Sequence, residues 1–482
     1  MADPAPEARG RRPETRLQRR RSRDRGRRGL VVLLLIAAVG LAAFALRGPA
    51  SAAAGTTPAQ PGATPGWSAR RIPQPVADEV ADIHLQADLT RLLQGVGGCA
   101  AAADSMGSRA AVQPDGAFIP ASTAKLLTGT AALSALGADF KFQTRALAPK
   151  APQGGSVSRL YLQGGGDPVI VTPAFTAALE KDPETSGSTS TDLGVLADAI
   201  VAAGVRSIPG GIAVDDSRYE SLRALPSWKA AYNIEVGPLG ALTVNRGFAQ
   251  FDGMRVQAAD PAIYAGTALA QILTQKGVTV GPVTRAAPPA GAATVATLTS
   301  PPLHDIVATM LRTSDNTIAE LLTREIGVKV SGKGTTAAGT AATIATLGKV
   351  GVPTTGVTLV DGSGLDRGDR LTCAALVATV AHEAATPADG LVAGLPVLGQ
   401  SGTLTDVAKG STIAGKLQAK TGTLDGVTAL TGLVDGARPL SFAFVANGTF
   451  STARNAQYKL QAAQIFAAFP RVPALADLVP AP

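Results

Sequence analysis

The sequence predicts an α+β protein, in which an antiparallel sheet is flanked by helices and a smaller α/β subdomain interrupts the chain. Three strand-like segments separated by tight turns, 416–423, 427–433 and 440–445, predict an antiparallel meander near the C-terminus. Over 145–290, short strands alternate with helices, which is typical of a separate α/β subdomain. The 482 residues, 45% of them apolar, exceed the length of one ordinary domain.

The N-terminal part of the chain has a different composition from the rest. Residues 1–28 contain eleven arginines and carry +7 of the net charge of +8, so this basic tail gives no support to a nucleic-acid partner for the body. The apolar run within 29–47 predicts a membrane anchor or a signal peptide, and its length favours the anchor. The Pro/Ala/Gly-rich segment 48–78 is expected to be a linker. The basic flank predicts that the tail is cytoplasmic and that the following domain is extracytoplasmic, at the cell membrane or in the cell envelope.

The main domain is expected to comprise 79–144 and 291–482, on either side of the inserted subdomain. Its first helix is predicted over 77–95 from the spacing of apolar residues, and a strand–turn–strand hairpin over 99–112. A further helix begins at Ser122 and ends at Gly137. Later helices are predicted at about 301–311, 317–327, 336–349, 373–385 and 453–469.

The cysteines and histidines restrict the possible chemistry. Cys99 and Cys373 are the only cysteines; an oxidising compartment permits a bridge, but the sequence cannot show that they meet. His84, His304 and His382 are scattered and form no metal-ligand pattern. We therefore expect no metal and no other cofactor.

Ser122 and Lys125 lie three residues apart at the start of an apolar helical run, so they share one helix face. Taken alone, this pattern also fits a Ser-capped helix with a solvated lysine. Two further motifs follow in order, Ser314-Asp315-Asn316 on a loop and Lys420-Thr421-Gly422-Thr423 on a strand. The conjunction of all three favours a catalytic interpretation.

The three motifs supply a consistent set of chemical roles. Ser122 would attack a carbonyl carbon, and Lys125 would take its proton if the amine is neutral. Half-neutrality of a lysine at pH 7 requires a pKa shift worth roughly 4–5 kcal/mol, which burial and a second cation, Lys420, would both favour. Ser314 would relay a proton to the leaving amine, and Asn316 would orient the substrate or Lys125.

The strand motif suits a substrate that ends in a carboxylate. It offers a cation, two hydroxyls and a glycine that would let the substrate approach the backbone, and a peptide could pair beside the strand (Lys420, Thr421, Gly422, Thr423).

Ser-x-x-Lys, Ser-Asp-Asn and Lys-Thr-Gly in this order are similar to the motifs of penicillin-recognising serine enzymes. The resemblance extends over about residues 80–470 to the D-alanyl-D-alanine carboxypeptidase/endopeptidases, the class C low-molecular-mass penicillin-binding proteins (peptidase family S13). Further segments that carry it are Gly166-Asp167-Pro168, Val214-Asp215-Asp216-Ser217-Arg218-Tyr219, Pro226-Ser227-Trp228, Ala241-Leu242-Thr243-Val244-Asn245 and Asp361-Gly362-Ser363-Gly364-Leu365.

This resemblance implies a β-lactamase/transpeptidase-like domain with an insertion, which is short here for the family. It also implies an acyl-enzyme on Ser122, formed with peptidoglycan stem peptides that end in D-Ala-D-Ala, and acylation of the same serine by β-lactams. The oxyanion hole would consist of the backbone N–H groups of Ser122 and Thr423. Three alternatives stay open: a β-lactamase-like hydrolase, a transpeptidase, and a non-catalytic peptidoglycan-binding homologue.

Overall fold

The structure, a computed structural model, describes residues 74–386 and 390–471. The basic tail, the predicted anchor or signal peptide and most of the linker lie outside these residues. Helix α2 (Gln74–Leu92) begins a few residues before the predicted end of the linker, with Pro75 in its first turn, where a missing N–H breaks no helical bond. Within the described ranges, no helix is both long and apolar enough to cross a membrane.

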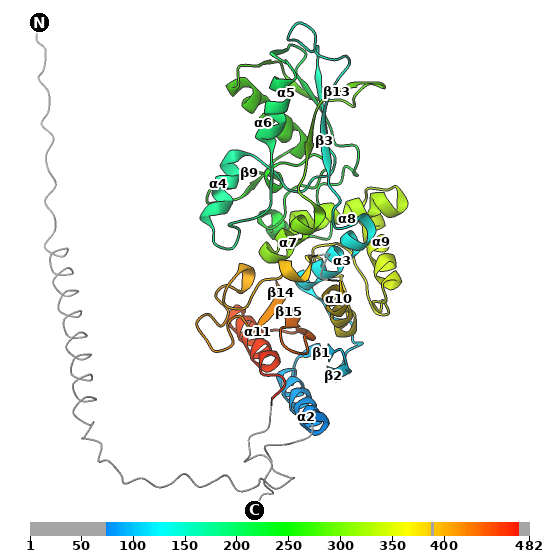
Figure 1. Cartoon of the computed structure of the whole chain (residues 1–482), viewed down its shortest axis with the longest axis vertical. Coiled ribbons are helices and arrows are strands. Elements are labelled where there is room, and N and C mark those ends of the chain that lie inside the picture. Colours follow the sequence, from blue (N-terminus) through cyan, green and yellow to red (C-terminus); the bar gives the residue numbers. More distant parts are fainter. Residues whose placement is uncertain (1–73, 387–389, 472–482) are drawn as a thin grey trace, which may run out of the picture. The chain divides into compact units, whose positions relative to one another are not determined.

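The central sheet has five antiparallel strands in the order β14-β15-β16-β1-β2. The predicted C-terminal meander forms three of them, and the predicted N-terminal hairpin supplies β1 and β2 beside it (Figure 1). Strand β1 pairs with β16, so the two ends of the domain meet in the middle of one sheet. The strands are β1 (Gly97–Asp104), β2 (Gly107–Val112), β14 (Leu417–Leu424), β15 (Val427–Val434) and β16 (Leu440–Asn447).

Two apolar cores lie on the two faces of this sheet. Alternate residues of a strand point to opposite faces, so Ala443 and Val445 of β16 join one core while Phe442 and Phe444 join the other. The second core is completed by α2 and α11 (Thr452–Ala467). The helices of the first core are α3 (Ala124–Leu136), α7 (Leu303–Thr313), α8 (Asn316–Ser331), α9 (Thr336–Lys349) and α10 (Cys373–Ala385).

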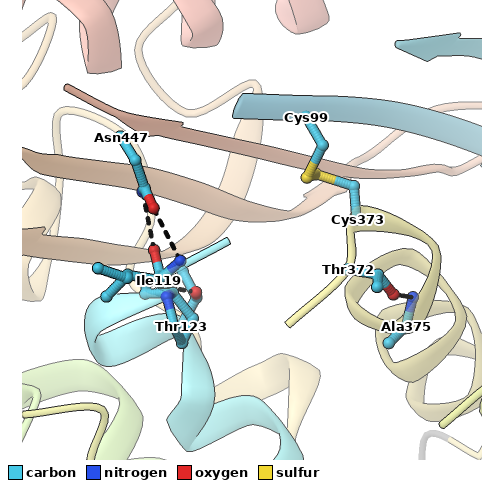
Figure 2. Close-up of a disulfide and its surroundings, with 8 residues drawn as sticks. Cys99, Ile119, Thr123, Thr372, Cys373, Ala375 and Asn447 are labelled. Carbon is cyan, nitrogen blue, oxygen red and sulfur yellow. Dashed lines mark hydrogen bonds between the residues drawn. A yellow bond between two sulfur atoms is a disulfide. The ribbon is translucent and has the colours of Figure 1, made fainter. Parts of the chain in front are cut away.

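Cys99 on β1 and Cys373 at the start of α10 are joined by a disulfide, with their Cα atoms 5.8 Å apart (Figure 2). Both residues are fully buried in the first core. The bond therefore ties α10 to the sheet across 274 residues of sequence, a pairing that the sequence left open.

The segment between α3 and α7 contains a second five-stranded sheet, in the order β12-β8-β4-β3-β13. Strands β4, β8 and β12 are parallel, whereas β3 and β13 are antiparallel neighbours at the other side. Helices α5 and α6 pack against this sheet and form a separate apolar core with it. The elements are β3 (Gln143–Ala148), β4 (Leu160–Gln163), β8 (Ile212–Asp215), β12 (Val283–Arg285), β13 (Ala293–Thr299), α5 (Leu193–Ala202) and α6 (Pro261–Gln275).

Shorter elements complete this segment. Two-residue strands pair in parallel as β5 with β6 and β7 with β11, and β9 forms a hairpin with β10. A small apolar cluster joins residues 219–241 of the segment to Leu321 of α8 and to Leu365. These elements are β5 (Ile170–Val171), α4 (Pro173–Lys181), β6 (Thr191–Asp192), β7 (Ser207–Ile208), η3 (Ala230–Ile234), η4 (Asn245–Gly247), β9 (Phe248–Gln250), β10 (Val256–Gln257) and β11 (Thr279–Val280).

Candidate active site

Ser122 lies in a single 3₁₀ turn, η2 (Ala121–Thr123), that leads directly into α3. The turn is held from two sides: the Thr123 hydroxyl donates to the Pro120 carbonyl at 2.8 Å, and Asn447 of β16 bonds both backbone groups of Ile119 (Figure 2). Ala121 has a φ of +48°, a left-handed conformation that a non-glycine residue adopts only at a cost. Ser122 is partly exposed, whereas the residues on either side of it are fully buried.

Lys125 is fully buried, and its amine has three neighbours. Lys125 Nζ lies 2.9 Å from Ser122 Oγ, 2.6 Å from Asn316 Oδ1 and 2.7 Å from the Ser363 carbonyl oxygen. The solvated-lysine interpretation is therefore wrong. Burial lowers the pKa of Lys125 to about 8, against the opposing effect of the carboxylates around it, led by Asp361.

The identity of these neighbours determines how a neutral Lys125 amine is oriented. The Ser363 carbonyl can only accept, and Asn316 Oδ1 also accepts because Asn316 Nδ2 donates to the Glu235 carbonyl at 2.9 Å. A neutral amine has two N–H groups and one lone pair. Both N–H groups are taken by these acceptors, so the lone pair is left to face the Ser122 hydroxyl, which is the arrangement that a general base needs.

Ser314 and Asp315 connect α7 to α8, and Asn316, which sequence analysis placed on a loop, is the first residue of α8. Ser314 ends α7 in a left-handed conformation with φ of +57°, and Asp315 caps α8 by accepting from the Ile318 N–H at 2.9 Å. This sharp turn places the two motif side chains against different lysines. Asn316 contacts Lys125, whereas Ser314 Oγ accepts a hydrogen bond from Lys420 Nζ at 2.9 Å.

Lys420 on β14 is also fully buried, and its amine bonds the Thr421 carbonyl at 3.0 Å as well as Ser314. Burial lowers the pKa of Lys420 well below its usual value, and the positive charges of Lys125 and Lys459 lower it further. We expected Lys420 to be the cation that depresses the pKa of Lys125. Burial, which we also expected, is the largest cause of the lowered Lys125 pKa, and the charge of Lys125 in turn lowers the pKa of Lys420.

A groove of about 640 Å³ opens over these side chains. Thr421 and Thr423 of β14 line it, and the Thr421 hydroxyl lies 3.0 Å from that of Thr403. Gly422 does not line it. A Cβ on Gly422 would lie 2.6 Å from the Pro120 carbonyl, so a glycine is required where β14 packs against the turn that carries Ser122.

Sequence reasoning missed a group of buried carboxyl side chains near Lys125. Glu320 of α8 accepts from the backbone N–H groups of Gly362 and Ser363, and so holds the carbonyl that bonds Lys125. Burial and the neighbouring Asp361 carboxylate raise the pKa of Glu320 to about 8. The only signal in the sequence was a carboxylate on the apolar face of a helix.

Asp361 and Asp366 are buried. Asp361 accepts from the backbone N–H groups of Gly364 and Asp366, at 2.7 Å each, and thereby shapes the turn that presents Ser363. Trp228 donates from Nε1 to Asp361 at 2.9 Å, and Ser227 bonds Asp366. The segment between β3 and β13 therefore forms hydrogen bonds with the turn whose Ser363 carbonyl contacts Lys125.

Arg246 makes a second connection from this segment to the site. It follows Asn245, and both have positive φ values, +55° and +56° respectively. The buried Arg246 guanidinium pairs with Asp315 at 2.8 Å and bonds the Pro168 carbonyl at 3.0 Å. The Ser314–Asn316 loop is therefore held between α8 and the inserted segment.

Comparison with known proteins places these features in context. The D-Ala-D-Ala carboxypeptidase 3 (S13) family model matches residues 77–255 and 249–469. A D-alanyl-D-alanine carboxypeptidase of Actinomadura sp. (strain R39) is 30% identical over 413 residues, which cover 69% of this chain and 73% of the relative. Carboxypeptidase DacB of Mycolicibacterium smegmatis is 31% identical over 458 residues, covering 89% and 94% of the two chains.

A solved structure has the same fold. Penicillin-binding protein 4 of Haemophilus influenzae matches with a TM-score of 0.66 at 20% identity, over 79% of this chain and 99% of the other. This likeness confirms the predicted α+β fold of the transpeptidase-like type.

Proposed function

The chain belongs to the D-Ala-D-Ala carboxypeptidase 3 (S13) family, and we propose that Ser122 is the nucleophile of a serine-type D-Ala-D-Ala carboxypeptidase that acts on peptidoglycan stem peptides. One observation carries this assignment of Ser122. Lys125 Nζ is enclosed by two acceptors and the Ser122 hydroxyl, so its neutral form can act only on Ser122.

In the acylation step, Ser122 Oγ bonds to the carbonyl carbon of the penultimate D-alanine while its proton passes to Lys125 Nζ. The backbone N–H groups of Ser122 and Thr423 would stabilise the negative charge on the carbonyl oxygen. The carbon–nitrogen bond then breaks, and the proton is returned through the Ser314 hydroxyl to the leaving nitrogen, which departs as D-alanine. Asn316 keeps Lys125 in place throughout.

Hydrolysis of the ester completes the cycle. Water adds to the acyl carbon and gives up a proton to Lys125 and the Ser314 hydroxyl. As the ester bond breaks, Ser122 Oγ takes a proton back from these groups. A β-lactam would acylate Ser122 by the same attack, with the ring nitrogen as the leaving group. A transpeptidase would differ only in using an amine in place of water. The similarity to carboxypeptidases favours water.

The test is labelling with a fluorescent penicillin, comparing the wild type with Ser122→Ala. The wild type should take up one label per chain and Ser122→Ala none, while both unfold at the same temperature. A second assay follows D-alanine release from a peptide that ends in D-Ala-D-Ala. Absence of both labelling and release from the folded wild type would refute the proposal. Labelling without release would favour the transpeptidase or the non-catalytic homologue.

We also propose that the N-terminal segment 29–47 anchors the protein and that the enzymatic domain lies outside the cytoplasm. The arginine-rich flank, the uncharged run and the disulfide support this location, because disulfides persist in oxidising compartments. Protease treatment of intact cells tests it: the domain should be degraded while a cytoplasmic marker survives. Recovery of the protein only with the cytoplasmic fraction would contradict it.

A further inference from the structure

Lys459 brings a third lysine to the groove, from a part of the chain outside the three motifs. It lies on α11, and its Nζ donates to Thr423 Oγ1 at 2.6 Å. Both residues line the groove, together with Ser122, Ser314 and Thr421. The lysine side chain is half-buried, so its ammonium is held at the wall of the groove and is not free in solvent.

The positive charge of Lys459 has no counterion in the part of the chain that is described. Lys229 also lines the groove, but it pairs with Asp425 at 3.3 Å. In contrast, Lys459 and Lys420 are not among the lysines of the described residues that pair with a carboxylate, which are Lys229, Lys276 and Lys409. Partly buried charges are normally compensated by a partner. Lys459, which lines the groove and has no anion in the described part of the chain, with the buried Lys420 behind Ser314, therefore indicates that the ligand brings the negative charge.

The hydrogen bond from Lys459 also determines what Thr423 can do. An ammonium group can only donate, so the Thr423 oxygen accepts and its hydroxyl hydrogen is left for another acceptor. An ammonium and a hydroxyl side by side offer two donors to the two oxygens of one carboxylate. Burial lowers the pKa of Lys459, which is the expected result for a cation that lacks its anionic partner.

We propose that Lys459 is a specificity-determining residue that, with Thr423, binds the free carboxylate of the substrate residue released by cleavage. This inference rests on the proposed function of the groove. Lys459 lies on the C-terminal helix α11, outside the Lys-Thr-Gly motif. The site then distinguishes a leaving residue with a free carboxylate from the same residue as an amide.

The experiment measures binding separately from catalysis. In the Ser122→Ala background, calorimetry compares a peptide that ends in D-Ala-D-Ala with the same peptide amidated at its C-terminus. The free acid should bind more tightly. Lys459→Met should reduce this preference tenfold or more, the usual size of a hydrogen bond to a charged group. Lys459→Arg, which keeps the charge, should retain most of the preference.

Lys229→Met is the matched control, because it also removes a groove-lining cation, one already paired with Asp425. It should leave the preference for the acid intact. The proposal is wrong if Lys459→Met weakens both peptides equally, if Lys229→Met has the same effect, or if the free acid shows no preferential binding. Failure of the proposed function would appear differently, as normal acid-selective binding with no D-alanine release by the protein that retains Ser122.

Discussion

Placing a carboxylate against Lys125 should slow acylation by removing the neutral amine. In Asn316→Asp, the oxygen that accepts from Lys125 Nζ at 2.6 Å keeps its position but carries a negative charge. With the Lys125 pKa at about 8, roughly 10% of the amine is neutral at pH 7. A carboxylate at this distance raises a partner's pKa by about 1–3 units, so the neutral fraction falls about 10- to 1000-fold.

The assay is the rate of acylation by a fluorescent penicillin as a function of pH. The wild-type rate should rise with pH through a midpoint near 8, because Lys125 must lose its proton to act, and the Asn316→Asp midpoint should move to higher pH. Ser451→Asp is the control: Ser451 lines the groove and caps α11, aspartate also caps helices, and the charge does not touch Lys125. An unchanged midpoint in Asn316→Asp would refute the assignment of Lys125 as the base.

Two further perturbations test the support of the site. Arg246→Met should destabilise the fold by roughly 3 kcal/mol in urea denaturation and slow acylation, because it leaves Asp315 without its ion pair beside the motif loop; unchanged stability would show that the pair is dispensable. Replacing both Cys99 and Cys373 by serine should lower the free energy of unfolding by on the order of 5 kcal/mol, the chain-entropy value for so long a closed loop, as measured against the oxidised wild type.

The lowered pKa of Lys125 also predicts how the stability of the fold changes with pH. The pKa of Lys125 is lower in the folded chain than the ordinary lysine value of 10.5. Between pH about 8 and 10.5 the unfolded chain therefore holds more protons at this group than the folded chain does. The contribution of Lys125 to stability consequently rises with pH across that window, and is most unfavourable below it.

Much of the fold could be predicted because its signals are local. The helix that begins near Ser122 and ends at Gly137, the N-terminal hairpin and the C-terminal meander each have their own periodicity and turn residues. The burial of Lys125 was predicted by a chemical requirement, since a lysine that acts as a base has to lose its proton near neutral pH.

The parts that escaped prediction depend on contacts between distant residues. Glu320 and Asp361 look like solvated charges in a sequence, and only the folded chain shows that they hold the turn that presents Ser363. Lys459 donates a hydrogen bond to Thr423 from the C-terminal helix, and nothing in the sequence of that helix indicates a role in the site. Gly422 also has a packing role that the motif does not reveal, because only the folded chain brings the Pro120 carbonyl against it.

The disulfide closes the chain from Cys99 to Cys373 into a covalent ring, with an N-terminal segment before it and a C-terminal tail after it. Ser122, Lys125 and the Ser314–Asn316 loop lie within the ring closed by Cys99 and Cys373, whereas Lys420 lies on the tail. The site is therefore assembled only when the tail adds β14–β16 beside β1. A single backbone cut inside the ring would leave a penicillin-labelled protein at its full mass in electrophoresis without reductant, and only reduction would release the labelled fragment.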